Sequence, residues 1–123
     1  MSIFDLQKKI YTTLNATALT ETAGVYDFIP ESASLPYVVI GDDKAEKWNT
    51  KTSDGWRTTS VIHIWGEERS MQTVKKLLKT VETLLSVDLD EFKFDGVSMI
   101  SAVRYDVEFV HGTIELNYKV EEE

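Results

Sequence analysis

The sequence predicts an α+β fold, in which two helices pack on one face of a mostly antiparallel sheet of four to five strands. Two segments, near residues 3–18 and 70–85, repeat apolar side chains at three- and four-residue spacing, which indicates amphipathic helices. The remaining apolar segments are rich in valine, isoleucine and aromatic residues, and several alternate with polar residues as strands do. Because each helix needs an apolar partner, the expected order is α-β-β-α-β-β in two layers.

The composition limits the functional classes. With 123 residues, 42% of them hydrophobic and 28% charged, the chain (1–123) is expected to form a single soluble domain. The absence of cysteine excludes disulfides and thiol catalysis. We expect neither a membrane span nor a signal peptide, and therefore folding in a cytoplasm. A net charge of −8 argues against nucleic-acid binding and is interpreted mainly as a source of solubility.

The first helix is expected to begin after an N-cap at Ser2 and to end near Ala18. An extended piece follows at Gly24–Ile29, and a loop at 30–34. Pro36 fixes its own φ and keeps the preceding residue extended, which predicts a strand over residues 37–41. The apolar residues of this strand are consecutive, so it should be buried on both faces or lie beneath a helix.

Residues 42–57 are polar and mixed in charge, and they predict a projecting loop or hairpin. The run Ser53-Asp54-Gly55 is typical of a hairpin turn. Two tryptophans, Trp48 and Trp56, lie in this segment. Trp48 has only polar neighbours in the sequence, so two interpretations stay open: an interface anchor, or packing onto the sheet edge.

The next strand, 58–65, should place Val61, His63 and Trp65 on one face, with isoleucines on the other. We expect Trp65 to cap the core under the second helix, and His63 to be packed or to face a partner. Ser70 is the expected cap of the second helix. The apolar stripe of that helix consists of Val74, Leu77, Leu78, Val81, Leu84 and Leu85.

The last third of the chain predicts strands. Asp95-Gly96 indicates a hairpin turn before a long alternating strand at 97–109, and His111-Gly112 a second turn before a strand at 113–120. Such strands aggregate when their edges are bare. Two devices could prevent this: a closed ring that pairs each edge with a neighbour, or the charges of Arg104, Glu115 and Lys119.

The residues do not converge on a catalytic site. His63 and His111 are the only histidines, and neither has a mate at helical metal-site spacing. The acid pairs, 42–43, 67–68 and 90–91, are sequence neighbours at element ends, which is poor geometry for acid–base catalysis. No nucleophile or phosphate-binding motif is present. We therefore expect no enzyme activity, no metal and no cofactor.

Three features together resemble one family. They are the element order, the unit Y-D-x-x-P…P-Y-V-V-I-G at residues 26–41, and the segment I-W-G-E-E-R-S at 64–70. With these the chain resembles, over nearly its whole length, the tail-completion or tail terminator (head–tail joining) proteins of long-tailed bacteriophages and prophages. The long polar segment 42–57 departs from the pattern, because this region varies within the family.

The resemblance implies a structural virion protein at the neck, assembled in the host cytoplasm. Such a protein forms a ring, expected to be hexameric, on the head-proximal end of the tail tube and stops further polymerisation. Its implied partners are other copies of itself, the major tail tube protein and the head-completion or stopper protein of the connector, while DNA passes through the lumen without specific binding. The residues expected to contact the tube or a neighbouring subunit are Lys44, Lys47, Trp48, Lys51, Trp56 and Arg57.

Two alternatives stay open. One is a different neck protein, an adaptor or stopper bound to the portal. The other is a small α+β binding module of the host cytoplasm that binds neither tube nor connector. The partner distinguishes the three interpretations, because fold alone does not fix function.

Overall fold

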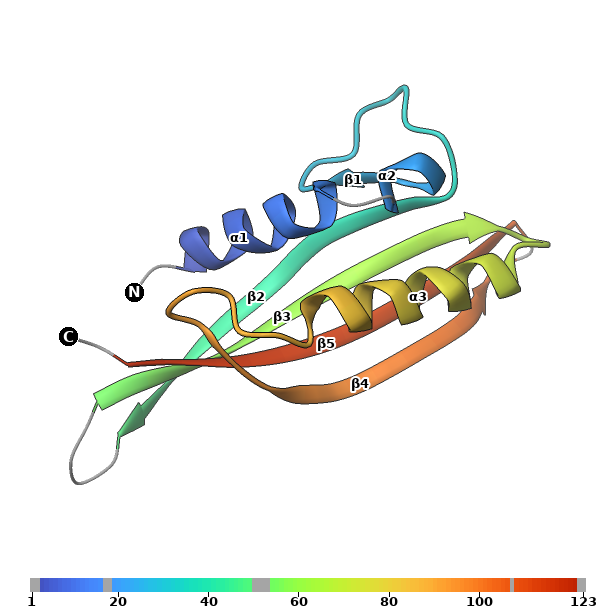
Figure 1. The fold of residues 1–123 in the computed structure, drawn as a ribbon. Helices are drawn as coiled ribbons and strands as arrows, with labels where there is room; N and C mark the ends of the chain where they lie inside the picture. Colours follow the sequence, from blue (N-terminus) through green and yellow to red (C-terminus); the bar gives the residue numbers. More distant parts are fainter. Residues whose placement is uncertain (1–2, 17–18, 50–53, 107, 122–123) are drawn as a thin grey trace.

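The computed structural model describes residues 3–16, 19–49, 54–106 and 108–121 (Figure 1). The predicted cap at Ser2 and helix end at Ala18 therefore lie outside the described residues. Within the described residues, two long helices and one four-residue helix accompany five strands. In chain order these elements are α1 (Ile3–Asn15), α2 (Leu19–Thr22), β1 (Gly24–Tyr26), β2 (Tyr37–Asn49), β3 (Asp54–Glu67), α3 (Met71–Leu85), β4 (Lys93–Tyr105) and β5 (Phe109–Glu121).

The five strands form one sheet in the order β1-β2-β3-β5-β4. Only the β1–β2 pair is parallel; the other pairs are antiparallel. Helices α1 and α3 lie side by side on the same face of this twisted sheet, α1 over β2 and α3 over β3 and β5 (Figure 1). The predicted α+β class and two-layer arrangement are confirmed, with β1 as the fifth strand.

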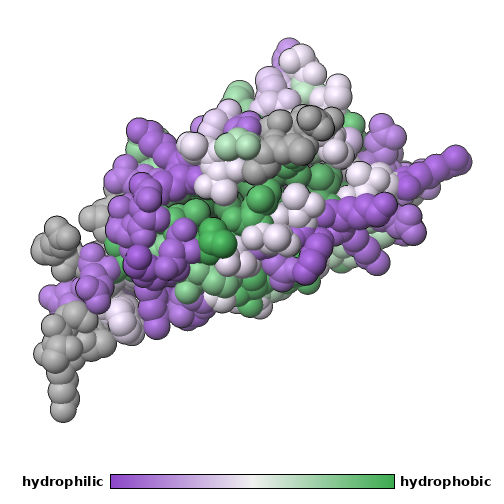
Figure 2. All heavy atoms as spheres, viewed as in Figure 1, coloured by the Kyte–Doolittle hydropathy of each residue, from purple (hydrophilic) through white to green (hydrophobic). Residues whose placement is uncertain are grey.

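The core lies between the helices and the sheet. Strands β3 and β5 send every second side chain towards the helices, and these side chains are buried. Hydrophobic atoms show mainly between the two long helices and along the border of α3 towards β4 (Figure 2). The largest side chain of the core, Tyr118, donates a hydrogen bond from its hydroxyl to the Leu85 carbonyl oxygen at 2.6 Å. The fully buried aliphatic residues include Leu6, Ile10, Leu14, Ile62, Ile64, Leu85, Ile114 and Leu116.

Helix α3 packs so closely on the sheet that it requires glycine beneath it. A Cβ atom at Gly112 would lie 2.7 Å from Val74 Cγ1 and 3.1 Å from Leu78 Cδ1. Gly112 is therefore a strand residue in the middle of β5, paired with Ile64 and Ala102. The predicted turn at His111-Gly112 is wrong, because the glycine serves helix packing and not a chain reversal.

The reversal between the last two strands lies earlier, between Tyr105 and Phe109. Asp106 has a φ of 61°, a left-handed conformation that aspartate tolerates better than most residues. The other predicted turn, at Asp95-Gly96, is also wrong. It is a β-bulge inside β4, where the pairing with β5 shifts between Phe94 and Val97. Gly96 has a φ of 104°, which explains the glycine.

A further bulge divides β2. Gly41 pairs with Val61, but Asp43 pairs with Ser60, and Asp42 between them has a φ of 61°. The strand therefore continues beyond its predicted end at residue 41. Its distal part pairs with the start of β3, so the hairpin predicted for 42–57 is confirmed in its described part. We call residues 44–49 and 54–57 the hairpin arm.

Ser70 occupies the N-cap position of α3, but its side chain does not cap the helix. Its hydroxyl donates instead to the Glu67 carbonyl oxygen, and its own carbonyl accepts the Val74 amide at 2.9 Å. The predicted stripe of α3 is buried apart from Leu84, which packs partly against the core.

Candidate functional site

The sheet has a second face, opposite the helices, which we call the open face. Within the described residues no helix lies on it, since α1 and α3 both contact the other face. The alternate residues of β3 and β5 that point to this side are half-buried or exposed, apart from Asn117. They include Arg57, Thr59, Val61, His63, Trp65, Phe109, His111, Thr113, Glu115 and Lys119.

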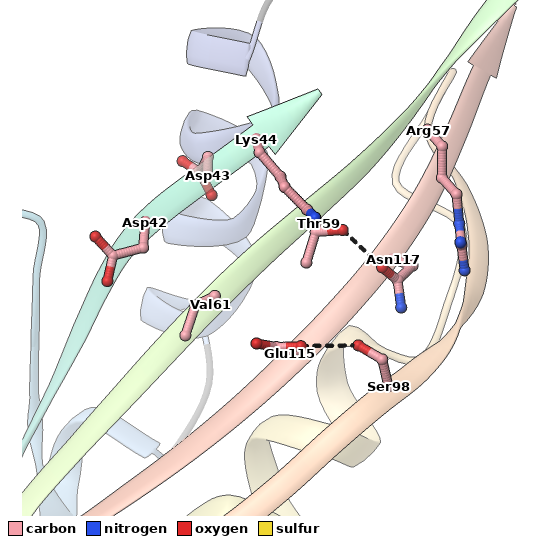
Figure 3. A pocket seen from close by; sticks show the side chains of 9 residues that line it. All are labelled: Asp42, Asp43, Lys44, Arg57, Thr59, Val61, Ser98, Glu115 and Asn117. Atoms are coloured by element: carbon pink, nitrogen blue, oxygen red, sulfur yellow. Dashed lines mark hydrogen bonds between the residues drawn. The ribbon is translucent and has the colours of Figure 1, made fainter. Parts of the chain in front are cut away.

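A shallow basin of about 640 Å³ lies on the open face (Figure 3). Its floor is polar: Thr59 Oγ1 donates to Asn117 Oδ1 at 2.8 Å, and Ser98 Oγ donates to Glu115 Oε2 at 3.1 Å. Lys44 extends towards Thr59 from the neighbouring strand (Figure 3). Each of these two hydroxyls therefore donates to a neighbouring side chain, one to an amide oxygen and the other to a carboxylate, and the basin contains both donors and acceptors of hydrogen bonds.

A chain of titratable side chains runs along the same face. His63 Nε2 lies 3.0 Å from Asp42 Oδ2, and His63 Nδ1 lies 2.9 Å from His111 Nε2. The His111 ring stacks on Trp65 with centroids 4.1 Å apart. Trp65 in turn meets Phe109 edge to face. The prediction that Trp65 caps the core under the second helix is wrong, because this side chain lies on the face that the helices do not cover.

Two pKa shifts describe this neighbourhood. Burial lowers the pKa of His111, and the adjacent His63 lowers it further, so a neutral His111 is favoured. Burial raises the pKa of the Asp43 carboxyl, with a smaller contribution in the same direction from Asp42. The Ser60 hydroxyl partly opposes that rise, although the geometry between them is too poor for a hydrogen bond.

The hairpin arm carries the residues that the sequence singled out. The structure brings Lys44, Trp48 and Arg57 to the side of the arm continuous with the open face, while Lys47 and Trp56 lie on the opposite side. Lys51 lies outside the described residues. The candidate residues therefore form two surfaces rather than one.

On the open side of the arm, Trp48 lies across the chain. A Cβ atom at Gly55 would come within 3.2 Å of Trp48 Cε3, and Lys119 Nζ lies 4.5 Å from the Trp48 ring centroid. Arg57 Nε and Asp95 Oδ2 form an ion pair at 3.0 Å. Lys44 is paired with Glu46 at 3.0 Å, and this contact lowers the pKa of the Glu46 carboxyl.

On the other side of the arm, Trp56 packs against the core and Lys47 Nζ lies 4.8 Å from its ring. The two tryptophans thus differ. Both side chains are partly exposed, but Trp56 is an extension of the core, whereas Trp48 covers the arm itself. This difference makes Trp48 the better candidate for an external contact.

The described residues offer little for catalysis or metal binding. They contain no group of three or more histidine, aspartate or glutamate side chains that could hold a metal ion. None of the described helices is long and apolar enough to cross a membrane.

Sequence reasoning placed His63 correctly on the face of Val61 and Trp65, but it missed the open face as a site. The signal was present in the alternation of β5, where His111, Thr113, Glu115 and Asn117 occupy every second position. A polar alternate row that is half-buried in a sheet indicates a face without a helix.

Comparison with solved structures identifies the fold. One similar chain belongs to the "Virion of native gene transfer agent (GTA) particle", with a TM-score of 0.78 and 21% sequence identity over 95% of both chains. Another is the bacteriophage SPP1 gp17 protein, with a TM-score of 0.65 and 22% identity over 94% of this chain and 88% of that one. No curated protein matches the chain in sequence. At these identities the structures establish the fold alone.

The fold is therefore one that a chain of a gene transfer agent virion and a bacteriophage protein also have. The family model described as tail completion protein gp17 matches residues 7–116. The chain belongs to this family and is a structural protein of bacteriophage type with a role in joining tail and head. The resemblance found in the sequence is confirmed.

Proposed function

We propose that this chain caps the head-proximal end of the tail tube as a hexameric ring. The ring stops addition of the major tail tube protein and then binds the head-completion or stopper protein of the connector, at the neck of the virion. Assembly takes place in the host cytoplasm. The whole chain acts as one domain, without catalysis or a cofactor.

The observation that carries the proposal is the family match over residues 7–116, which includes α3, the hairpin arm and most of the sheet. Two features of the structure support it. The sheet is open at both edges, β4 on one side and the distal half of β2 on the other, and a ring covers such edges. The net charge of −8 suits a lumen that lets DNA pass without holding it.

The hairpin arm is the proposed contact with the tube or with a neighbouring subunit. Lys44, Trp48 and Arg57 form its open side, and Lys47 and Trp56 the other, with Lys51 assigned to the same arm from sequence. Aromatic and arginine side chains at a partly exposed site are typical anchors of protein interfaces.

Electron microscopy tests the proposal directly. The protein is mixed with growing tubes of the major tail protein of its own particle. We expect a ring at one end of each tube and arrested growth at that end. Bare tube ends at high protein concentration would overturn the proposal, and binding to the portal or connector instead would identify an adaptor or stopper.

The variant Trp48→Ala tests the arm. We expect weaker capping of tubes with an almost unchanged thermal midpoint, because Trp48 packs on the arm and not on the core. Trp56→Ala is the matched control and should lower the midpoint, since Trp56 packs against the core. Unfolding of the Trp48 variant would make that residue structural and remove it from the proposed interface.

A further inference from the structure

A groove of about 340 Å³ lies between α3 and β4. Leu78, Ile100 and Ala102 supply apolar surface, and Lys75 and Lys79 stand on the α3 side. Ile100 is 45% exposed although it points towards the helix side of the sheet, because α3 leaves the outer border of β4 uncovered. This groove is independent of the hairpin arm and of the open face.

Between Val97 and Val103 the edge strand beside the groove carries no charged side chain, which is the usual protection of such an edge. The bulge at Asp95–Gly96 disrupts only its first part, and from Met99 onward the pairing with β5 is regular. Met99 and Val103 are also exposed, so apolar side chains appear on both faces of an unpaired edge. Proteins usually place charges at such positions, as the distal edge of β2 does with Lys44 and Glu46. An unprotected apolar edge marks a binding surface.

The same chain carries an apolar projection that lacks a covering surface. The loop between β1 and β2 extends away from the body (Figure 1). Phe28 in this loop is 82% exposed and Ile29 is 40% exposed. The loop is held by a turn in which the Ala33 amide donates to the Pro30 carbonyl oxygen at 3.0 Å. A phenylalanine this exposed, two residues before a hydrogen-bonded turn, is typical of an interface anchor.

The charges around the projection and around the groove are of opposite sign. The projection is flanked by two acids, Asp27 and Glu31. The groove is lined by Lys75, Lys79 and one acid, Glu82, which pairs with Lys79 at 3.3 Å, so the lining keeps an excess of positive charge. The two flanking acids and the two lysines are exposed. Opposite charges around an apolar centre favour association and fix its register.

We propose that Phe28 and Ile29 of one copy insert into the groove between α3 and β4 of the next copy. The loop adjoins β1 and the groove adjoins β4, which are the two opposite edges of the sheet. Each copy therefore carries both halves of the contact at different sites. Such a head-to-tail contact generates a ring when its rotation closes. This contact deepens the proposed function, because it supplies the join between subunits of the ring.

Disulfide trapping tests the contact, and the chain has no native cysteine. The pair Ile29→Cys and Ala102→Cys should give a ladder of cross-linked multimers on tube ends and in concentrated solution under mild oxidation. Thr80→Cys in place of Ala102→Cys is the matched control, because Thr80 is exposed on α3 but does not line the groove. We expect cross-linking at background level in the control.

Substitutions give a second readout. Phe28→Asp should abolish the ladder and leave the fold intact, whereas Phe4→Asp, at a phenylalanine of α1 that is 60% exposed, should leave the ladder unchanged. The double variant Lys75→Glu/Lys79→Glu should lose the ladder, and adding Asp27→Lys/Glu31→Lys should restore it.

The outcomes separate this contact from the proposed function. Capped tubes without the Ile29–Ala102 cross-link, and capping that survives Phe28→Asp, would overturn the contact while the capping function stands. If wild-type protein does not cap tubes, the proposed capping function is wrong. The cross-linked ladder in solution then tests the contact by itself: a ladder supports the contact, and the absence of a ladder refutes it.

Discussion

The two faces of the sheet are built from alternate residues of the same strands, and they differ in almost every respect. Towards the helices, β5 presents Ile114, Leu116 and Tyr118, all fully buried. Towards the open face it presents His111, Thr113 and Glu115. His111 contacts Thr113 and a histidine of β3, and Glu115 accepts a hydrogen bond from a serine of β4. The first set determines the fold, and the second is free to determine contacts. Substitutions on either face should therefore have separable effects.

The largest effect should come from a buried residue of the helix-facing row. Ile114→Ala removes a side chain that is fully buried between the sheet and the helices. The loss of burial and the remaining cavity should lower the free energy of unfolding by about 2–5 kcal/mol. Thr113→Ala, on the open face, should change it by less than about 1 kcal/mol. Equal losses in denaturant titrations would break the distinction between the faces.

A smaller effect should follow from adding a single methyl group. Gly112→Ala places a Cβ 2.7 Å from Val74 Cγ1, so α3 must shift, at a cost of about 1–3 kcal/mol. At Gly41 the same addition meets no atom within 4 Å, and the free energy of unfolding should change by less than about 1 kcal/mol. If thermal midpoints show no difference between the two variants, then α3 is less tightly held than its contacts indicate.

The smallest effect should be a pH dependence located on the open face. The pKa of His111 is lowered by folding from its ordinary value of 6.5, so the unfolded chain binds more protons in this range. His111 should therefore cost stability as the pH falls through about 6.5, until its lowered folded pKa is passed. The groups facing it are His63, Trp65 and Thr113, with Asp42 beyond His63.

His111→Gln measures that contribution. Thermal midpoints are compared at about pH 8 and about pH 5, a range that includes the titration of an ordinary histidine. The variant should lose less stability between the two values than the wild type, since other groups titrate equally in both. The same drop in both proteins would show that His111 does not report the burial of the open face.

The class of fold was predictable because the two helices and the apolar alternation of β3 and β5 are local signals. The sequence did not predict which face of the sheet the helices cover. Alternation of side chains along a strand defines two faces, but it does not say which of them packs against a helix. Trp65 was misplaced for this reason. The turns were misplaced for a different reason. Gly112 allows close packing of α3, and Gly96 lies in a β-bulge, so neither marks a chain reversal. The reversal itself contains Asp106, which has a positive φ.

The candidate site was predicted only in part. The hairpin arm followed from its polar sequence and its two tryptophans, but their division between two sides depends on a register shift that no composition reveals. The groove beside α3 could not be inferred at all. It arises because α3 lies over β3 and β5 and leaves the outer border of β4 bare, which is a property of how the layers are offset.

The extra residue at Asp42 changes which residues of β2 face the open side of the sheet. Before it, odd-numbered residues of β2 share a face with odd-numbered residues of β3; after it, even-numbered ones do. Removing that one residue would let Asp43 follow Gly41 in a regular ladder, so Trp48 and Trp56 would keep their sides, while the strand would lose the bend and the extra twist that a bulge gives it. The length of the chain at this point, more than the identity of any side chain, therefore decides the direction in which the arm leaves the body.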